Sequence, residues 1–302
     1  MTDYLIRHRT LYKYEREALD SQNLSCLVPG DFPGQCLLGW TLEIGPEPEW
    51  RTHWFDVYGN RREAFSLATA HDQLDVELFA RVRRDQPLGL SSSLPWEAAV
   101  LPDGSAWKEA PPMMREFVCA SPLLPVQRRA GFDAEDCFEA GVPVERALLR
   151  FMQRVYELFD YDPTATTTFT DLDEVYEKKA GVCQDFAHAA IAELRRRGFS
   201  AGYVSGYLET LPLPGKEKLR GADATHAWYA VYVPGTGWMH FDPTNNVVPG
   251  TRHVITAWGR DYSDVAPVKG VVLGGGAHKV DVQVDVWQWP DQVPEEYQSL
   301  GL

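Results

Sequence analysis

The sequence has little positive charge, and this deficit limits its partners. Its 302 residues include 29 Lys and Arg against 43 Asp and Glu, which gives a formal net charge of −14 at pH 7. Nucleic acids and anionic membranes are bound by concentrated basic surfaces. The one dense basic cluster, the Arg triplet at residues 195–197, is better explained as the solvated end of a helix. The composition therefore predicts neither a nucleic acid nor a membrane as a partner.

Long apolar runs and clustered cysteines are missing as well. No stretch approaches the roughly 18 apolar residues of a membrane span, and the N-terminus lacks the apolar run of a signal peptide. The five cysteines are scattered and include no CxxC pair, which argues against a disulfide framework and a structural zinc site. We therefore expect a reducing, cytoplasmic location, no cofactor and no metal. The cysteines are Cys26, Cys36, Cys119, Cys137 and Cys183.

The first third of the chain has the pattern of β-structure. Hydrophobic residues make up 44% of the chain, enough for a sizeable core. Strand-like segments separated by turn signals predict an antiparallel, sandwich-like β domain; they are residues 4–14, 39–44, 61–68 and 73–83. Residues 86–112 are rich in Pro, Ser and Gly and form a candidate linker. We place a β-rich domain at 1–110 and a second domain at 111–302.

The second domain is predicted to combine helices with antiparallel strands. Apolar residues recur every three or four positions after Pro143, which suits the first turn of a helix. Further helices are predicted at 171–179 and 182–197. Strand-like segments follow at 201–208, 226–233, 238–242 and 280–286. Helices followed by antiparallel strands indicate an α+β fold.

Cys183 is placed where a thiol can be reactive. It lies at the start of the predicted helix 182–197, where the positive end of the helix dipole favours the thiolate. The free backbone N–H groups of the first helical turn can also bind a developing oxyanion. For a lone cysteine, however, a buried structural role is the more common explanation.

A predicted hairpin adds a histidine and a carboxylate. His226 begins one strand and Asp242 ends the next, with a turn around residues 234–237. A three-residue loop at 234–236, with Gly237 free to take a positive φ, would pair Asp242 with Trp228. Asp242 and His226 would then be diagonal neighbours on one face, about 7–8 Å apart before their side chains extend. Singly, His226 could be a core histidine and Asp242 a turn-capping carboxylate.

A cysteine at a helix N-terminus that faces a histidine and an aspartate on adjacent strands is the layout of papain-like thiol enzymes. Several segments, in the same order, resemble the bacterial transglutaminase-like superfamily and its N-terminal region. They are HRTLYKY (8–14), YGN (58–60), GVCQDFAH (181–188), YVSGYL (203–208), HAW (226–228), GW with FDPTNN (237–246) and GRDYSDVAP (259–267).

This resemblance implies a papain-like core preceded by a β-sandwich-like domain. It maps a catalytic triad onto Cys183, His226 and Asp242. The implied chemistry is attack of the thiolate on a carboxamide or peptide carbonyl to give a thioester, so the implied partner is a peptide or amide-containing substrate. Water would then hydrolyse the thioester, whereas an amine would be acylated. We favour hydrolysis by a cysteine peptidase or amidase, with protein-glutamine transamidation as the alternative.

Neighbouring polar residues have weaker claims to a role. The backbone or side chain of Gln184 could assist the oxyanion, although a surface glutamine is as reasonable. Asp185 and His188 lie three residues apart on one helix and could bind each other. His240 is a rival base on the face of Asp242.

Two other classes of function stay open. A peptide- or glycan-binding module on the same fold would have Cys183 covered by its own chain, whereas an enzyme would expose it. A metal-dependent hydrolase is least favoured, because no HExxH motif is present and the eight histidines are dispersed.

Overall fold

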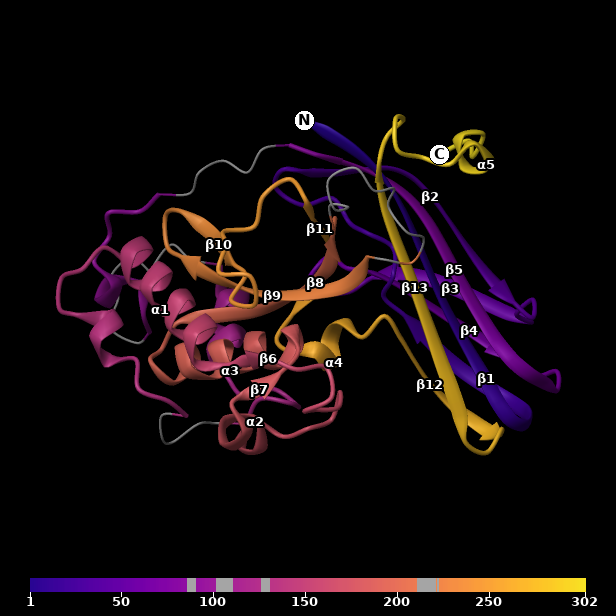
Figure 1. Cartoon of the computed structure of the whole chain (residues 1–302), viewed down its shortest axis with the longest axis horizontal. Coiled ribbons are helices and arrows are strands. Elements are labelled where there is room, and N and C mark those ends of the chain that lie inside the picture. The colour runs from indigo at the N-terminus through magenta and orange to yellow at the C-terminus, as the bar shows by residue number, and fades with distance from the viewer. Residues whose placement is uncertain (86–90, 102–110, 126–130, 211–220, 222) are drawn as a thin grey trace.

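The structure is a computed structural model that describes residues 1–85, 91–101, 111–125, 131–210, 221 and 223–302. A large, strand-rich part and a part in which helices cover a small sheet lie side by side (Figure 1). None of the helices in these described ranges is long and apolar enough to span a bilayer. The predicted boundary at residue 110 and most of the predicted linker lie outside the described residues.

The strand-rich part is a seven-stranded antiparallel sheet organised around its first strand. β1 pairs at its start with β5 and β13, and near its end with β4 and β12. Buried residues of β2, β4 and β5 belong to one core cluster, so a single continuous sheet forms the predicted β-rich domain. The strands are β1 Thr2–Ser25, β2 Gln35–Gly45, β3 Trp50–Phe55, β4 Arg61–Leu67, β5 His71–Arg84, β12 Val268–Gly274 and β13 His278–Gln288.

The two C-terminal strands of this sheet come from the region that the sequence assigned to the second domain. β13 runs alongside β1 from Tyr4 to Tyr14, and its Val284 and Val286 enter the core of the sheet. Figure 1 shows β12 and β13 returning from the helical part to the first strands. The alternating valines do predict a strand, but alternation does not identify a partner that lies more than 200 residues away.

The helical part consists of helices packed on the sheet β10-β9-β8-β11. The predicted helices form at nearly the predicted positions, as α1 Val144–Leu158, α2 Leu172–Lys178 and α3 Cys183–Arg196. α3 buries its apolar face against β8 and β9, and α1 packs against α3 in the same core. The strands are β8 Ser200–Leu208, β9 Ala224–Val233, β10 Gly237–Phe241 and β11 His253–Gly259. Together the two parts give the predicted mixture of helices and antiparallel strands.

The β9–β10 hairpin has the predicted register. Gly237 pairs with Val233 and Phe241 pairs with Tyr229, so the loop is three residues long. Gly237 has φ of +104°, in the region that favours glycine. Asp242 follows Phe241 directly, and its side chain therefore lies at the end of the hairpin near the start of β9.

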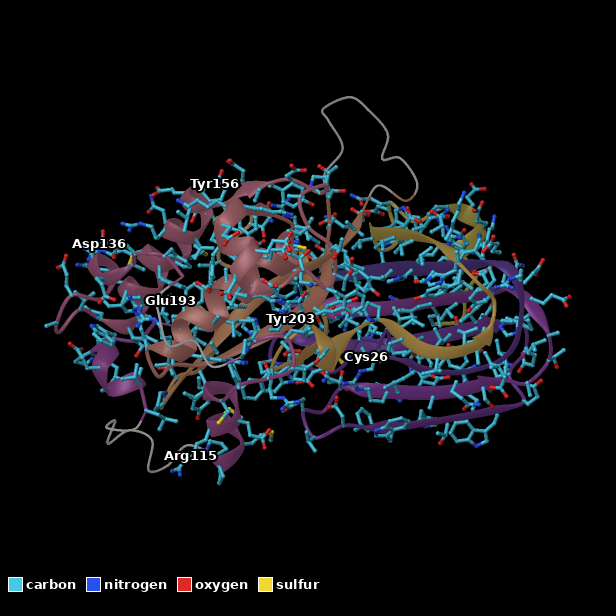
Figure 2. The ribbon with its side chains drawn as sticks, turned by 90° about the horizontal axis from the view of Figure 1, so that it is seen from below. Cys26, Arg115, Asp136, Tyr156, Glu193 and Tyr203 are labelled. Atoms are coloured by element: carbon cyan, nitrogen blue, oxygen red, sulfur yellow. The ribbon has the colours of Figure 1, made fainter. Side chains whose placement is uncertain are left out.

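The strand-rich part and the helical part meet near β8 and β11. Tyr207 of β8 and Val254 of β11 are buried in the core of the large sheet. Figure 2 shows Cys26, whose backbone N–H donates to the carbonyl of Pro267 at 2.9 Å, toward the middle of the molecule. The short elements are the 3-10 helices η1 Trp96–Ala99, η3 Pro112–Val118 and η4 Glu135–Phe138, the strands β6 Asp160–Tyr161 and β7 Ala180–Gly181, and the helices α4 Tyr262–Val265 and α5 Glu295–Gln298.

Candidate active site

Asp185 fixes the start of α3. Its Oδ2 accepts hydrogen bonds from the backbone N–H of Val182 at 2.8 Å and from the Thr166 hydroxyl at 2.6 Å. The carboxylate packs so closely against Gly181 that a Cβ there would lie 2.3 Å from Oδ2. A carboxylate that caps the first turn in this way sets where the helix begins. Because Cys183 is the first residue of α3, Asp185 also sets the position of the thiol.

Cys183 is half-buried and free, so its thiol is available for chemistry. Gly181 pairs with Tyr161 in the short β6–β7 ladder, and this ladder holds the backbone that leads into the helix. As the first two residues of α3, Cys183 and Gln184 have backbone N–H groups without an acceptor inside the helix. The thiol thus lies beside donors that can stabilise a negatively charged oxygen.

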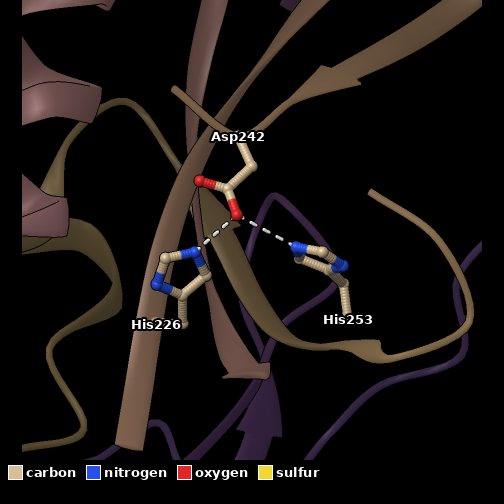
Figure 3. A group of neighbouring side chains, drawn as sticks. All are labelled: His226, Asp242 and His253. Atoms are coloured by element: carbon tan, nitrogen blue, oxygen red, sulfur yellow. Dashed lines mark hydrogen bonds and ion pairs between the residues drawn. The ribbon is translucent and has the colours of Figure 1, made fainter. Parts of the chain in front are cut away.

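His226 lies between Cys183 and Asp242. Its Nε2 is 2.8 Å from Asp242 Oδ2, and the side chain is buried (Figure 3). Burial alone lowers the pKa of His226, but hydrogen bonds with Asp242 and Cys183 outweigh burial and raise the pKa to about 10. The imidazole is therefore protonated at neutral pH. Because Nε2 is engaged by the carboxylate, Nδ1 is the nitrogen left to exchange a proton with the thiol.

Asp242 is completely buried and is held by several donors. Oδ2 accepts from His226, from His253 Nε2 at 3.1 Å and from Asn245 Nδ2 at 2.7 Å. Oδ1 accepts from the backbone N–H groups of Thr244 and Asn245. Burial raises the pKa of Asp242, but the hydrogen bonds from the two histidines outweigh it and hold the pKa well below its usual range. The carboxylate is therefore charged and has a fixed orientation.

His253 is a neutral partner of the same carboxylate. The backbone N–H of Gly250 donates to His253 Nδ1 at 3.3 Å, which leaves the ring proton on Nε2, where it points to Asp242. Burial lowers the pKa of His253, and Asp242 offsets that effect only in part. The hydrogen-bond pattern and the direction of the pKa shift both assign the neutral tautomer.

Two imidazole nitrogens and a carboxylate oxygen within 4.8 Å of one another are also the atom types that bind zinc. The hydrogen bonds of His226, Asp242 and His253 do not fit this use. His253 Nε2 carries a proton, so it has no lone pair to offer a metal ion. His226 is also protonated at neutral pH. The cluster fits a hydrogen-bonded network better than a metal site.

The three supporting residues, Gln184, Asp185 and His188, have different hydrogen-bond partners. Gln184 Nε2 donates to the carbonyl of Thr168 at 3.0 Å on the helix surface. Asp185 and His188, which could have bound each other, have other partners: Asp185 caps the helix, whereas His188 Nε2 accepts from the backbone N–H of Tyr262 at 3.2 Å. Burial raises the pKa of Asp185 and lowers the pKa of His188 to about 4.

Asp185 and His188 also line a surface pocket of about 390 Å³, together with residues 122, 123, 125, 168–173 and 175. Cys183 does not line this pocket.

The rival base His240 accepts from Trp228 Nε1 at 3.1 Å, and burial lowers its pKa to about 4. His240 is therefore a neutral hydrogen-bond acceptor for Trp228.

Two residues of the cluster were not predicted. His253 begins β11, and the irregular residues 243–252 before this strand give no pattern that predicts where it starts. The apolar, β-prone run that follows His253 was the available signal. Asn245 lies in the FDPTNN motif, but nothing in that motif alone indicates that its amide binds Asp242.

Comparisons with known proteins agree with this architecture. The family model described as the transglutaminase-like superfamily matches residues 135–243, and the bacterial transglutaminase-like N-terminal region matches residues 4–83. An uncharacterized protein of Mycobacterium tuberculosis is 35% identical over 94% of this chain and 92% of its own length. A protein-glutamine gamma-glutamyltransferase of Pseudomonas aeruginosa is 31% identical over 40% of this chain and 19% of its own length.

A solved structure supports the fold over nearly the whole chain. A Cytophaga hutchinsonii protein named "putative cysteine protease" superposes with a TM-score of 0.76 at 20% identity, and it covers 95% of this chain and 91% of its own. The first family match ends one residue after Asp242 and includes Cys183 and His226. The chain therefore belongs to the transglutaminase-like superfamily and carries the bacterial N-terminal region of that superfamily.

Proposed function

We propose that this protein hydrolyses amide or peptide bonds with Cys183 as nucleophile, His226 as proton carrier and Asp242 as the carboxylate that orients His226. One observation carries the proposal: His226 interacts with both the thiol and a buried carboxylate, and these contacts raise its pKa to about 10 although burial opposes this. A histidine that only fills a core has no need of two such partners. A protonated imidazole beside a cysteine favours the reactive thiolate.

The geometry supports a two-step acyl transfer. The thiolate of Cys183 attacks the substrate carbonyl, and the backbone N–H groups at the start of α3 stabilise the oxyanion that forms. His226 gives its proton to the departing amine, which leaves a thioester on Cys183. His226 then removes a proton from the water that attacks the thioester, and collapse of the tetrahedral intermediate releases the carboxylic acid and regenerates the Cys183 thiolate beside a protonated His226. Asp242 keeps the ring in the required orientation throughout.

The acceptor of the acyl group decides between hydrolysis and transamidation. We favour water, in line with the name of the Cytophaga hutchinsonii protein. The glutamyltransferase name of the Pseudomonas aeruginosa relative favours an amine as the second candidate. Both acceptors would use the same residues, so the products must distinguish them.

A pure binding module on this fold is less well supported. That alternative requires Cys183 to be covered by its own chain, whereas in the described part of the chain Cys183 is only half-buried. All five cysteines are free, and we propose a reducing compartment such as the cytoplasm, where a nucleophilic thiol stays reduced.

Labelling with iodoacetamide across pH 5–9 tests the nucleophile, and the modified peptides are identified by mass spectrometry. The chain contains its own references: Cys36 and Cys119 are exposed, whereas Cys26 and Cys137 are buried and have raised pKa values. We expect Cys183 to be labelled faster at pH 7 than the exposed references Cys36 and Cys119, because a protonated imidazole lies beside its thiol.

Two variants complete this test. His226→Ala should slow the labelling of Cys183 at pH 7 and leave the rates at Cys36 and Cys119 unchanged, whereas Cys183→Ala should remove only the fast phase. Slow labelling spread over several cysteines, equal in wild type and His226→Ala, would overturn the proposal. Incubation with dimethylated casein and a biotinylated amine then separates new peptide termini, which indicate hydrolysis, from biotin incorporation.

A further inference from the structure

We infer that His253 is a positioning residue for Asp242 and that the N-terminal sheet, by holding β11, supports the active site. This inference deepens the proposed function and rests on it. It assigns a role to the large sheet, which contributes none of the three proposed triad residues.

Both nitrogens of the His253 ring are engaged, so the ring cannot turn freely. Nε2 donates to Asp242 and Nδ1 accepts from Gly250, which fixes the ring at two opposite points. The Trp228 ring packs edge-on against it, with ring centroids 5.3 Å apart and an interplanar angle of 83°. The side chain of His253 is 5% exposed. A ring held in this way can serve as a rigid donor.

Asp242 Oδ2 needs such a donor because it is shared. His226 and His253 approach the same oxygen from two sides (Figure 3). Asn245 also binds Oδ2, and its amide lies 3.4 Å from His226 Nε2. Without His253, the carboxylate could turn toward Asn245 and away from the imidazole. His253 therefore acts on His226 through Asp242.

The N-terminal sheet holds the strand that carries His253. The Gln35 side chain, at the start of β2, donates to the carbonyl of Ile255 at 2.7 Å and accepts from its backbone N–H at 2.8 Å. Ile255 is two residues beyond His253 and lies where β11 shifts register against β8. Gln35 is buried and thus replaces a missing strand partner for β11.

A second contact reaches the other side of His253. Arg84, at the end of β5, donates to the carbonyl of Gly250 at 3.3 Å, and the N–H of that same residue binds His253 Nδ1. The same guanidinium donates to the carbonyl of Gly34 at 3.0 Å. Residues of β2 and β5 therefore brace the backbone on both sides of His253.

The charged and titratable groups around His253 define what a pH profile reports. Asp242 and His226 face it across the site, Arg252 precedes it in the chain, and His240 and Arg84 lie on neighbouring elements. His253 itself is neutral near pH 7, so its loss removes a donor and not a charge. A change in the titration of His226 would thus report the altered orientation of Asp242.

The test compares His253→Phe with His253→Gln in the full-length chain. Phe keeps a ring but has no donor, whereas Gln places an N–H near the position of Nε2. We measure the iodoacetamide labelling rate of Cys183 across pH 5–9 and the titration of His226 by NMR of ¹³C-histidine-labelled protein, with His226→Ala to assign the signal. The matched control is His71→Gln, because His71 is a buried histidine of β5 that hydrogen-bonds to the carbonyl of Thr69.

We expect His253→Phe to lower the pKa of His226 by about one unit, the effect of losing one hydrogen bond to a charged group. The same loss shifts the thiolate–imidazolium pair toward the neutral thiol and imidazole, so the labelling rate at pH 7 should fall by up to about tenfold. Asp242 should also protonate at higher pH, so the charged pair survives over a narrower pH range. His253→Gln should restore most of both values, and His71→Gln should change neither.

Unchanged labelling and an unchanged His226 titration in His253→Phe would overturn the inference. So would equal defects in His253→Phe and His253→Gln, which would indicate a role in packing. If wild-type Cys183 is not labelled selectively, the proposed function fails, but the His226 titration still tests the positioning role. Gln35→Met, which removes both hydrogen bonds to Ile255, should shift that titration in the same direction by a smaller amount, and no shift would remove the sheet from the inference.

Discussion

Two buried histidines, one in α3 and one in β9, differ in a way that identifies the reactive part of the molecule. His188 accepts a backbone N–H from Tyr262, and burial lowers its pKa to about 4. His226 is buried to a similar degree, but Asp242 and Cys183 reverse the effect of burial and raise its pKa to about 10. Burial is thus common to both sites, and the charge of the partners decides which histidine carries a proton at pH 7.

Two buried aspartates show the same contrast. Asp185 receives two hydrogen bonds from neutral donors, and burial still raises its pKa. Asp242 receives bonds from two histidines as well as from Asn245 and the backbone, and its pKa falls. A helix cap needs an acceptor, whereas a group that supports an imidazolium needs a charge. Removing the charge at each aspartate should therefore have very different consequences.

The largest effect is expected from Asp242→Asn. Without the carboxylate charge, burial should bring the pKa of His226 below its ordinary value of 6.5, so the imidazole would be neutral at pH 7. We expect turnover at pH 7 to fall by roughly 10²- to 10⁴-fold, the usual contribution of acid–base catalysis. The NMR titration of His226 and the labelling rate of Cys183 measure the change directly.

Asp185→Asn is the matched control for that variant. The amide oxygen of Asn can still accept from Val182, so the start of α3 should persist and the labelling of Cys183 should stay within about threefold of wild type, because no ion pair is lost. Circular dichroism checks that both variants fold. A loss in Asp185→Asn as large as that in Asp242→Asn would contradict the distinction between a cap and a charged support.

The dependence of stability on pH should show the contrast between His188 and His226. His188 has a folded-state pKa of about 4, below the unfolded value of about 6.5, so the stability linked to it is lost as pH falls through this window. His226 has a raised pKa, so its contribution is complete below pH 6.5 and is lost as pH rises toward 10. The two histidines thus act in opposite directions on either side of pH 6.5.

His188→Gln isolates one side of this dependence. Gln can accept from Tyr262 but does not titrate, so the slope of the unfolding free energy between pH 4 and 6.5 should decrease by up to about 1.4 kcal/mol per pH unit. Urea unfolding at several pH values measures the slope. Part of it should remain, because burial also lowers the pKa values of His8 and His240 to about 4. An unchanged slope would show that His188 is not neutral by burial.

Local patterns in the sequence were sufficient for much of this arrangement, but long-range contacts were not. The helix that starts at Cys183 and the register that brings Asp242 to His226 follow from periodicity and from the Gly237 turn. The pairing of β13 with β1 could not follow from such patterns. The place of His253 in the site could not be predicted for the same reason, because its position depends on Gln35 and on the irregular segment before β11.

The smallest effect is expected at the residue next to the nucleophile. The Gln184 side chain binds the carbonyl of Thr168 on the helix surface, so in this structure its amide is engaged away from the thiol. If the oxyanion is held by the backbone N–H groups of the first turn, Gln184→Ala leaves those donors in place, and turnover should change by less than about threefold. The loss of one oxyanion donor would instead cost roughly 10²- to 10³-fold. Single-turnover acylation of Cys183 in this variant therefore separates a backbone oxyanion site from one that recruits the Gln184 side chain when substrate binds.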